Sequence, residues 1–315
     1  MTAADDRKML RETVAALLDK HASPAKVRAA MDSPLGYDES LWATLCEQVG
    51  VAALVIPEDL GGAGGELADA AAVLEVLSRG LVPTPLLGTT LAEIALLAAD
   101  EPDTEALERL AAGTSVGAVV FDRDYVVNGA VADEVIAVED SALIRWTDVT
   151  AEPVPTVDPT RRLARLAPGA TAVIGRDPGI ADTAAILLAA EQIGAAARCL
   201  ELTVDYCKER VQFGRPIGSF QALKHRMADM YVAVQSARAV VGDAIAAPTA
   251  VSAALARLAA SEAFTAVAGE AIQMHGGIAI TWEHDIQLYF KRAHGSAQLF
   301  GSPREQLRRL EAEVL

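Results

Sequence analysis

The stretch RVQFGRPIGSFQ, residues 210–221, joins two long helical patterns and decides how the C-terminal half of this chain is interpreted. Apolar side chains recur at helical spacing before it, and a second helical pattern covers about residues 222–246 after it. The connection carries groups that suit a flat anionic ligand: Arg210 offers a planar fork for phosphate, Gln212 both donates and accepts, and Phe213 offers a ring face. A solvated turn with a surface arginine is the alternative interpretation of the same residues.

A second turn, QMHGGIAIT at residues 273–281, follows an alanine-rich helical pattern. Gly276 and Gly277 leave one side of this turn without side chains, so backbone N–H groups can face an anion there. Gln273 adds a side-chain amide. A Gly-Gly pair after a helix is in most cases only a helix terminator, and no strand precedes it as a dinucleotide-binding G-x-G-x-x-G loop requires.

The helical patterns around these two turns predict a C-terminal four-helix bundle. Small residues recur on the inner faces, and the connections are short, which is typical of an up-and-down bundle. The expected helices begin near Asp182 and then cover about 222–246, 249–274 and 283–298, with a short last helix over about 303–313.

The N-terminal third shows amphipathic helical patterns broken by turns, and near Thr114 the pattern changes to short β-branched runs separated by turn residues. We expect the fourth N-terminal helix over about 91–99, because Pro83 and Pro85 interrupt the preceding pattern. We therefore predict a mainly α (α+β) chain with an N-terminal helical domain over 1–113, a shortened β middle domain over 114–178 and a C-terminal helical bundle over 179–315.

Composition argues against several classes of function. The chain has 315 residues, 52% of them apolar, and a formal net charge of −16 without a basic stripe, so we expect no nucleic-acid binding. No uninterrupted apolar run reaches the ~18–20 residues of a membrane span, and the N-terminus is charged, so we expect no span and a cytoplasmic location. We predict no metal site and three buried cysteines, because neither metal-ligand nor redox spacing relates Cys46, Cys199 and Cys207.

Taken together, the two turns resemble those of the acyl-CoA dehydrogenases, and the segment LVIPEDLGGAGG at 54–65 resembles that family's N-terminal helical domain. The resemblance covers nearly the whole chain. It implies that FAD lies at a subunit interface, where these bends reach the flavin of a neighbouring chain. The cofactor-binding residues that it implies are Arg210 at the pyrophosphate, Gln212 and Phe213 at the adenosine end, and Gln273, Gly276 and Gly277 around the pyrophosphate.

The FGSP turn that begins at Phe300 resembles the family's flavin-contacting EGT turn, which implies Gly301 and Ser302 as further FAD-binding residues. In most family members the Glu of that turn is the base that removes the α-proton of the acyl-CoA, and here Phe300 holds its place. A minority of members carry the base early in the first bundle helix, where this chain has Ala184 and Ala185. Neither residue type can accept a proton, so we predict no catalytic residue in this chain.

A second departure lies between residues 114 and 180, where we find neither the TEP…GSD-type segment nor the WIT-type strand that hold the isoalloxazine ring in active members. The chain thus resembles the short subunit of actinobacterial heteromeric (α2β2) acyl-CoA dehydrogenases, which are known in steroid side-chain and ring catabolism. The resemblance implies a longer acyl-CoA dehydrogenase homologue as partner, which supplies the base and the flavin-ring pocket, and an acyl-CoA substrate.

Two other interpretations stay open at this point. One is a self-sufficient homo-oligomeric dehydrogenase with an atypical base such as Glu191, although a glutamate among alanines is usually solvated or paired within its helix. The other is a flavin-free structural scaffold. We also expect Glu283 and Asp285 to cap the fourth bundle helix, and Arg161 and Arg162 to be surface charges rather than contacts to CoA phosphates.

Overall fold

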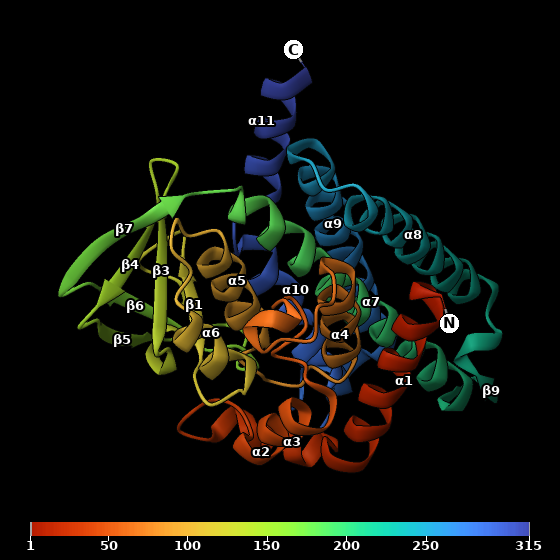
Figure 1. Ribbon diagram of the computed structural model, residues 1–315. Helices are drawn as coiled ribbons and strands as arrows, with labels where there is room; N and C mark the ends of the chain where they lie inside the picture. The colour runs from red at the N-terminus through yellow and green to blue at the C-terminus, as the bar shows by residue number, and fades with distance from the viewer. Residues whose placement is uncertain (1, 315) are drawn as a thin grey trace.

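The structure is a computed structural model, and it describes residues 2–314. Three parts follow one another along the chain: helices on the N-terminal side, a small β region in the middle and a bundle of long helices on the C-terminal side (Figure 1). In Figure 1 the sheets lie at one flank of the molecule and the long helices at the other, with some of the N-terminal helices between them. This arrangement confirms the predicted mainly α (α+β) fold with its small β middle region.

Local sequence sets the ends of several N-terminal helices. Thr2 and Asp5 form a capping box at the first helix, and the Asp38 carboxylate accepts two N–H groups at the start of the third. One boundary differs from the expectation: the fourth long helix begins directly after Pro85 and not near residue 91. Proline does not prevent a helix from starting, because the first helical N–H groups have no partner within the helix. The elements are α1 (Ala3–His21), α2 (Pro24–Asp32), α3 (Glu39–Val49), η1 (Glu58–Leu60), α4 (Leu67–Arg79), α5 (Leu86–Leu97) and α6 (Thr104–Ala111).

The middle region consists of two small sheets with strand orders β1-β3-β4-β7 and β2-β6-β5. Strand β1 pairs with β3 in parallel, and the other neighbours pair antiparallel. A second, smaller core forms here around Trp146, Val135 and Leu166. The elements are β1 (Gly117–Val120), β2 (Val126–Val127), η2 (Gly129–Val131), β3 (Glu134–Glu139), β4 (Ala142–Thr147), β5 (Thr150–Val154), β6 (Leu163–Ala167) and β7 (Ala170–Arg176).

The C-terminal part is the predicted bundle, with α7 and α9 at its centre and α8 on its outside (Figure 1). Nearly every residue of α7 between positions 184 and 200 is buried, whereas α8 buries only a narrow stripe. The last helix projects away from the rest of the molecule in Figure 1. The elements are α7 (Ile180–Glu209), α8 (Gln221–Ala246), α9 (Ala250–His275), α10 (Ile286–Gln298) and α11 (Pro303–Val314).

The start of α10 corrects the expected role of Glu283 and Asp285. The helix begins at Ile286, and the ring Nδ1 of His284 accepts the Ile286 N–H at 3.1 Å, so His284 supports the first turn. Asp285 makes no capping hydrogen bond with its side chain and instead pairs with Arg28 of α2 at 2.6 Å. A carboxylate expected to act within its own helix therefore links the bundle to the N-terminal helices.

Two helical stretches, Ile180–Glu209 and Ala250–Ile280, are long and apolar enough to cross a membrane by length and composition. Neither stretch is an uninterrupted apolar run in the sequence, because Glu191 interrupts the first and Arg257 interrupts the second. The most apolar windows of the two stretches are 78% and 50% buried inside the fold. Packing at the centre of the bundle accounts for this apolar character, since the core helix of a globular protein meets the same criteria.

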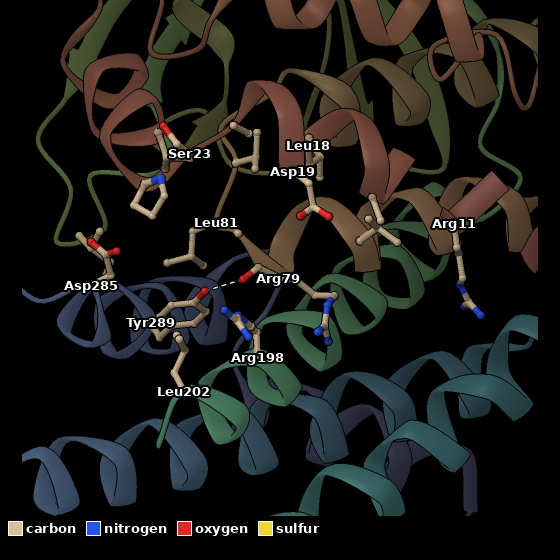
Figure 2. Close-up of a pocket in the computed structure, with 18 of the residues that line it drawn as sticks. Arg11, Leu18, Asp19, Ser23, Arg79, Leu81, Arg198, Leu202, Asp285 and Tyr289 are labelled. Carbon is tan, nitrogen blue, oxygen red and sulfur yellow. Dashed lines mark hydrogen bonds between the residues drawn. The ribbon is translucent and has the colours of Figure 1, made fainter. Parts of the chain in front are cut away.

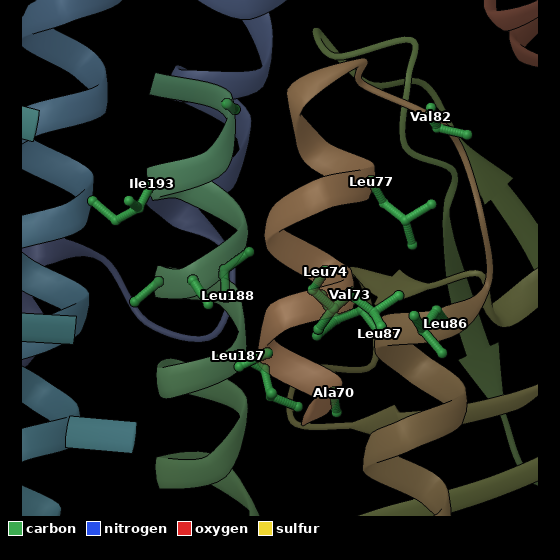
Figure 3. Close-up of a cluster of buried hydrophobic side chains, with 14 of the residues drawn as sticks. Ala70, Val73, Leu74, Leu77, Val82, Leu86, Leu87, Leu187, Leu188 and Ile193 are labelled. Carbon is green, nitrogen blue, oxygen red and sulfur yellow. The ribbon is translucent and has the colours of Figure 1, made fainter. Parts of the chain in front are cut away.

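The N-terminal helices join the bundle where α4 packs along α7 (Figure 3). Leu187 of α7 points toward α4, while Ile193 points to the other side, into the bundle. The two backbones approach closely at Gly194: a Cβ placed there would lie 2.1 Å from the carbonyl oxygen of Glu75 and 2.2 Å from Oγ of Ser78. Glycine is therefore required at this contact, which fixes the N-terminal helices against the bundle.

Candidate functional site

The α7–α8 bend is a tight hairpin rather than an open loop. Strands β8 (Val211–Gln212) and β9 (Arg215–Pro216) pair across Phe213 and Gly214, whose φ values are 53° and 76°. Two consecutive residues with positive φ are typical of a type I′ turn, which favours the sequence Asn-Gly. A Phe-Gly pair is therefore only a weak sequence signal for a β-hairpin. The Phe213 side chain is held at the tip of this hairpin and is 92% exposed.

The other predicted ligand groups of this bend are exposed as well. Arg210 and Gln212 both face solvent, and the Arg210 side chain forms no hydrogen bond or ion pair within residues 2–314. The base of the hairpin is fixed by Phe220, whose ring lies 4.1 Å from the Arg215 guanidinium and meets Phe213 edge-on. The bend is therefore a rigid support that presents a cation, an amide and an aromatic ring outward.

The α9–α10 bend begins at Gly276, which ends α9 with a φ of 64° and leads into the short helix η4 (Gly276–Ile280). A Cβ on Gly276 or Gly277 would meet no atom within 4 Å, so the backbone of both residues borders open space. The Gly276 N–H donates to the carbonyl of Ile272, so Gly276 offers close approach rather than a free donor. Gln273 is exposed on the preceding turn, which brings all three predicted residues to one surface.

The structure brings these two bends together at the same end of the bundle. The Tyr206 ring, one turn before Arg210, stacks on the His275 ring, which precedes Gly276, with 4.3 Å between ring centroids. The Tyr206 hydroxyl also donates to the carbonyl of His275 at 3.2 Å. Burial lowers the pKa of His275, so its ring stays neutral at pH 7 and packs as an aromatic group. Six of the eight predicted cofactor residues therefore share one surface.

Gly301 and Ser302 lie at the far end of α10 from those six residues. Since α10 has 13 residues, the two ends are separated by about 20 Å. The N–H and hydroxyl of Ser302 both donate to the Glu305 carboxylate, at 2.7 and 2.8 Å, and these bonds lower the pKa of Glu305. Within one subunit Ser302 acts as the cap of α11, and Gly301 and Ser302 lie apart from the other six predicted residues.

The fully buried guanidinium of Arg257 holds this second turn in place. It donates to the backbone carbonyls of Ser296 and Leu299, the latter at 2.8 Å, and so satisfies carbonyl groups at the end of α10. Its other nitrogen donates to Gln192 of α7 at 2.9 Å. Burial lowers the pKa of Arg257 to about 9. This arginine was not identified from the sequence, because its partners on α7 and α10 lie far from it along the chain.

The positions at which the sequence resemblance implies a base are closed in this chain. Ala184 and Ala185 are completely buried, and the Phe300 ring packs edge-on against Phe121 of the β region with 5.1 Å between centroids. None of the three best-formed cavities within residues 2–314 has any of these residues in its lining. The side chains at these three positions thus fill this end of the bundle.

Glu191 is buried in an ion-pair cluster, which corrects the expectation of a solvated or helix-paired residue. Its carboxylate accepts hydrogen bonds from Arg161 at 2.5 Å and from Arg292 of α10 at 2.9 Å. Burial alone would raise the pKa of Glu191, but the two arginines outweigh it and hold the pKa below its usual value. Arg161 is nine-tenths buried here, so its predicted role as a surface charge was wrong.

The same cluster fastens the loop of residues 155–162 to the bundle. Arg292 pairs with Asp158 at 2.6 Å and donates to the carbonyl of Thr160 at 3.0 Å. A cavity of about 30 Å³ remains beside Arg161, whose Nη1 has no partner among the described residues, and this volume suits a single water molecule. The sequence signal was the run DPTRR at 158–162, whose charges we had assigned to the surface.

The cysteine prediction is confirmed, since Cys46, Cys199 and Cys207 are all buried free thiols. Burial raises the pKa of Cys46 to about 12, which leaves its thiol protonated and unreactive at pH 7. Within residues 2–314, no group of three His, Cys, Asp or Glu side chains is arranged to hold a metal ion.

Comparison with known families gives matches at both ends of the chain. Residues 4–114 match the model of the acyl-CoA dehydrogenase N-terminal domain, and residues 181–315 match that of the acyl-CoA dehydrogenase C-terminal domain. The chain is 70% identical over 314 residues to the acyl-CoA dehydrogenase IpdE2 of Mycobacterium tuberculosis, a match that covers 100% of this chain and 99% of that protein.

Two solved structures share the whole fold. The steroid ACAD Tcur3481-Tcur3483 superposes with a TM-score of 0.89 at 25% identity, covering 99% of this chain and 98% of that one. The ChsE4-ChsE5 complex from Mycobacterium tuberculosis superposes with a TM-score of 0.87 at 26% identity, covering 100% of this chain and 98% of that one.

Proposed function

Because the chain belongs to the acyl-CoA dehydrogenase family, whose members are oxidoreductases acting on CH–CH bonds, we propose that it is the short subunit of a heteromeric acyl-CoA dehydrogenase. In this assembly the chain supplies the adenine and pyrophosphate side of an FAD site. A longer homologous subunit supplies the catalytic base and the pocket for the flavin ring. The substrate is an acyl-CoA thioester.

The observation that carries this proposal is the contrast between the two ends of the bundle. At one end, Arg210, Phe213 and Gly276 lie on an exposed surface that none of residues 2–314 covers. At the other end, Ala184 and Phe300 stand where a base is needed and fill the space. A chain with exposed hydrogen-bond donors at one end and no open reaction site at the other is what we expect of one subunit in a heteromeric enzyme.

The residues of the exposed end fit the chemistry of FAD. The Arg210 guanidinium can pair with a phosphate in two-pronged fashion, the Phe213 ring can stack on adenine, and the bare backbone at Gly276 and Gly277 allows close approach of the pyrophosphate. Gln273 can donate to a phosphate oxygen. When bound, FAD supplies the acceptor for the hydride that leaves the β-carbon of the acyl group. This chain's residues bind and orient the non-reacting half of that cofactor.

Exposed apolar side chains on the bundle support a protein partner. Large hydrophobic side chains exposed within residues 211–282 gather on the bends and along α8 and α9, and such clusters on a surface mark interaction sites: Val211, Phe213, Tyr231, Val232, Leu255, Ile278, Ile280 and Trp282. The two-component names of the similar solved structures support a hetero-oligomer, for which we propose α2β2 stoichiometry. The description of one of them as a steroid ACAD supports a steroid-derived acyl-CoA as substrate.

Use of Glu191 as an atypical base is disfavoured by its surroundings. Two arginines bind its carboxylate and lower its pKa, which weakens it as a proton acceptor. The adjoining cavity of about 30 Å³ has no room for a thioester. The experiment described next distinguishes the proposed heteromeric subunit from a self-sufficient homo-oligomer and from a flavin-free scaffold.

The proposal is tested by purifying this chain alone and after co-expression with a longer acyl-CoA dehydrogenase homologue from the same organism. We expect flavin absorbance and acyl-CoA-dependent reduction of an artificial electron acceptor only in the co-purified complex. A yellow, active preparation of the single chain would support the homo-oligomer instead. A complex that forms but contains no flavin would support the scaffold.

Substitution of Arg210 tests the residue assignment. In the complex, Arg210→Ala should weaken FAD retention about tenfold or more, because a charge-assisted contact to phosphate is lost. The matched control is Arg165→Ala, which removes an equally exposed arginine of the β region. Equal FAD content in the two variants would overturn the assignment of Arg210.

A further inference from the structure

A cleft of about 710 Å³ opens between the N-terminal helices and the bundle (Figure 2). Its walls come from α1, the start of α2, the end of α4 with the following turn, the middle of α7 and the start of α10. None of the eight residues considered for FAD binding lines it. Its volume lies within the range of roughly 300–1,000 Å³ that small-molecule sites occupy.

The floor of the cleft is apolar and rigid. Six of its side chains are buried in the core and close its base: Leu18, Val27, Leu81, Val82, Leu288 and Tyr289. Leu81 has a φ of 50°, a conformation that is costly for a leucine. The turn is held by the Tyr289 hydroxyl, which donates to the carbonyl of Arg79, as the dashed line in Figure 2 marks. The floor is thus formed in advance of any ligand.

One rim of the cleft carries two guanidinium groups side by side. Arg79 and Arg198, both labelled in Figure 2, pair with the same carboxylate of Glu201 at 2.8 and 3.1 Å. Glu201 itself does not line the cleft. Arg79 uses only Nη2 and Arg198 only Nη1 in these bonds. The remaining N–H groups of both arginines have no partner within the described part of the chain, so they are available to a ligand.

Charged side chains of both signs line the cleft. Glu75 is likewise shared by Arg11, which lines the cleft, and Arg238, at 2.9 and 2.8 Å. Among the side chains that line the cleft, Arg11, Arg79 and Arg198 are matched in number by Glu12, Asp19 and Asp285, so the formal charges of the lining balance. On the opposite side, Asp285 is neutralised by Arg28, and Glu12 and Asp19 of α1 are exposed. An anionic group in the cleft is attracted to the Arg79 and Arg198 rim.

We propose that this cleft binds an amphipathic organic anion, with its apolar body on the floor and its carboxylate or phosphate at Arg79 and Arg198. The chemistry of the rim requires an anion that can accept from two guanidinium groups at once. The floor requires an unbranched or fused apolar body rather than a polar one. The site is separate from the proposed FAD surface and does not depend on the proposed function.

The test is calorimetric titration of the full chain, and of its complex with the longer subunit, with four ten-carbon probes. Decanoate and decyl phosphate carry the two candidate head groups, decanol has no charge, and decyltrimethylammonium has the opposite charge. We expect both anions to bind with one-to-one stoichiometry and decanol to bind at least about tenfold more weakly. The tighter of the two anions identifies the head group. Equal binding of all four probes, or no binding of either anion, overturns the proposal.

Variants locate the binding. Arg79→Met and Arg198→Met should each weaken anion binding about tenfold and leave decanol unaffected, since each removes charge-assisted donors but keeps an apolar stem. Arg123→Met is the matched control, because Arg123 is an exposed arginine with a single carboxylate partner on the β region. Thermal melting of each variant checks that it is folded. Unchanged anion binding in both cleft variants, or loss of binding in the complex because the partner fills the cleft, overturns the proposal.

Discussion

The two ends of the C-terminal bundle are built from the same helices, but one end is exposed and the other is closely packed. The end that contains Phe213 and Gly276 is exposed, and its side chains have few partners within the chain. The end that contains Ala184, Arg257 and Phe300 is filled, and the Arg257 guanidinium there donates to backbone carbonyls and to Gln192. The bundle therefore combines one open end with one end that has become part of the core.

This difference separates stability from ligand contacts. Substitutions at the closed end should change the free energy of unfolding, because they disturb buried charges and close packing. Substitutions at the open end should change association with the cofactor or partner and leave the isolated chain as stable as before.

The largest effect is expected from Glu191→Ala at the closed end. The change leaves Arg161 and Arg292 buried without their shared carboxylate, and breaking a buried ion pair in this way costs about 3–5 kcal/mol of the free energy of unfolding. Chemical denaturation of the isolated chain measures it. A loss below about 1 kcal/mol would mean that the cluster is more hydrated than the structure shows.

A smaller loss is expected from Gly194→Ala, at the contact between α4 and α7. The added methyl group would lie 2.1 Å from the carbonyl oxygen of Glu75, so the helices must move apart, at a cost of about 1–3 kcal/mol. Gly269→Ala in α9 is the matched control, since a Cβ there meets nothing within 4 Å and alanine favours helix. Equal melting temperatures for the two variants would contradict the close approach.

The pH dependence of stability should also report on the closed end. The folded-state pKa of Glu191 lies below the usual glutamate value of 4.5, so its contribution to stability is present above that value and is lost as the pH falls through the folded pKa. We expect the wild type to lose stability more steeply than Glu191→Gln as the pH falls below about 4.5. Denaturation curves at a series of pH values compare the two; parallel curves would show that Glu191 is not ionised in the folded chain.

The smallest effect on stability is expected from Phe213→Ala at the open end. Because the ring is 92% exposed, the free energy of unfolding of the isolated chain should change by less than about 0.5 kcal/mol. In the complex the same variant should release FAD more readily, which filtration and absorbance measure. A variant that is clearly less stable alone would show that the ring packs within its own chain and not on a ligand.

Much of the fold was predictable because it depends on local signals. Helical periodicity located the long bundle helices to within a few residues, and the two bends were found from the residue types placed between them. The Phe213–Gly214 hairpin was missed because its turn lacks the usual Asn-Gly signal. The pairing of Glu191 with Arg161 was missed because it joins residues 30 positions apart, and periodicity says nothing about which buried charges meet.

The stacked rings of Tyr206 and His275 have a consequence for how the exposed surface can vary. They set the gap between the two bends by the thickness of two aromatic rings, independently of the loops that follow. We therefore expect the separation of the bends to stay the same when residues of those loops are exchanged. The stack thus works as a spacer that fixes the separation of the two bends.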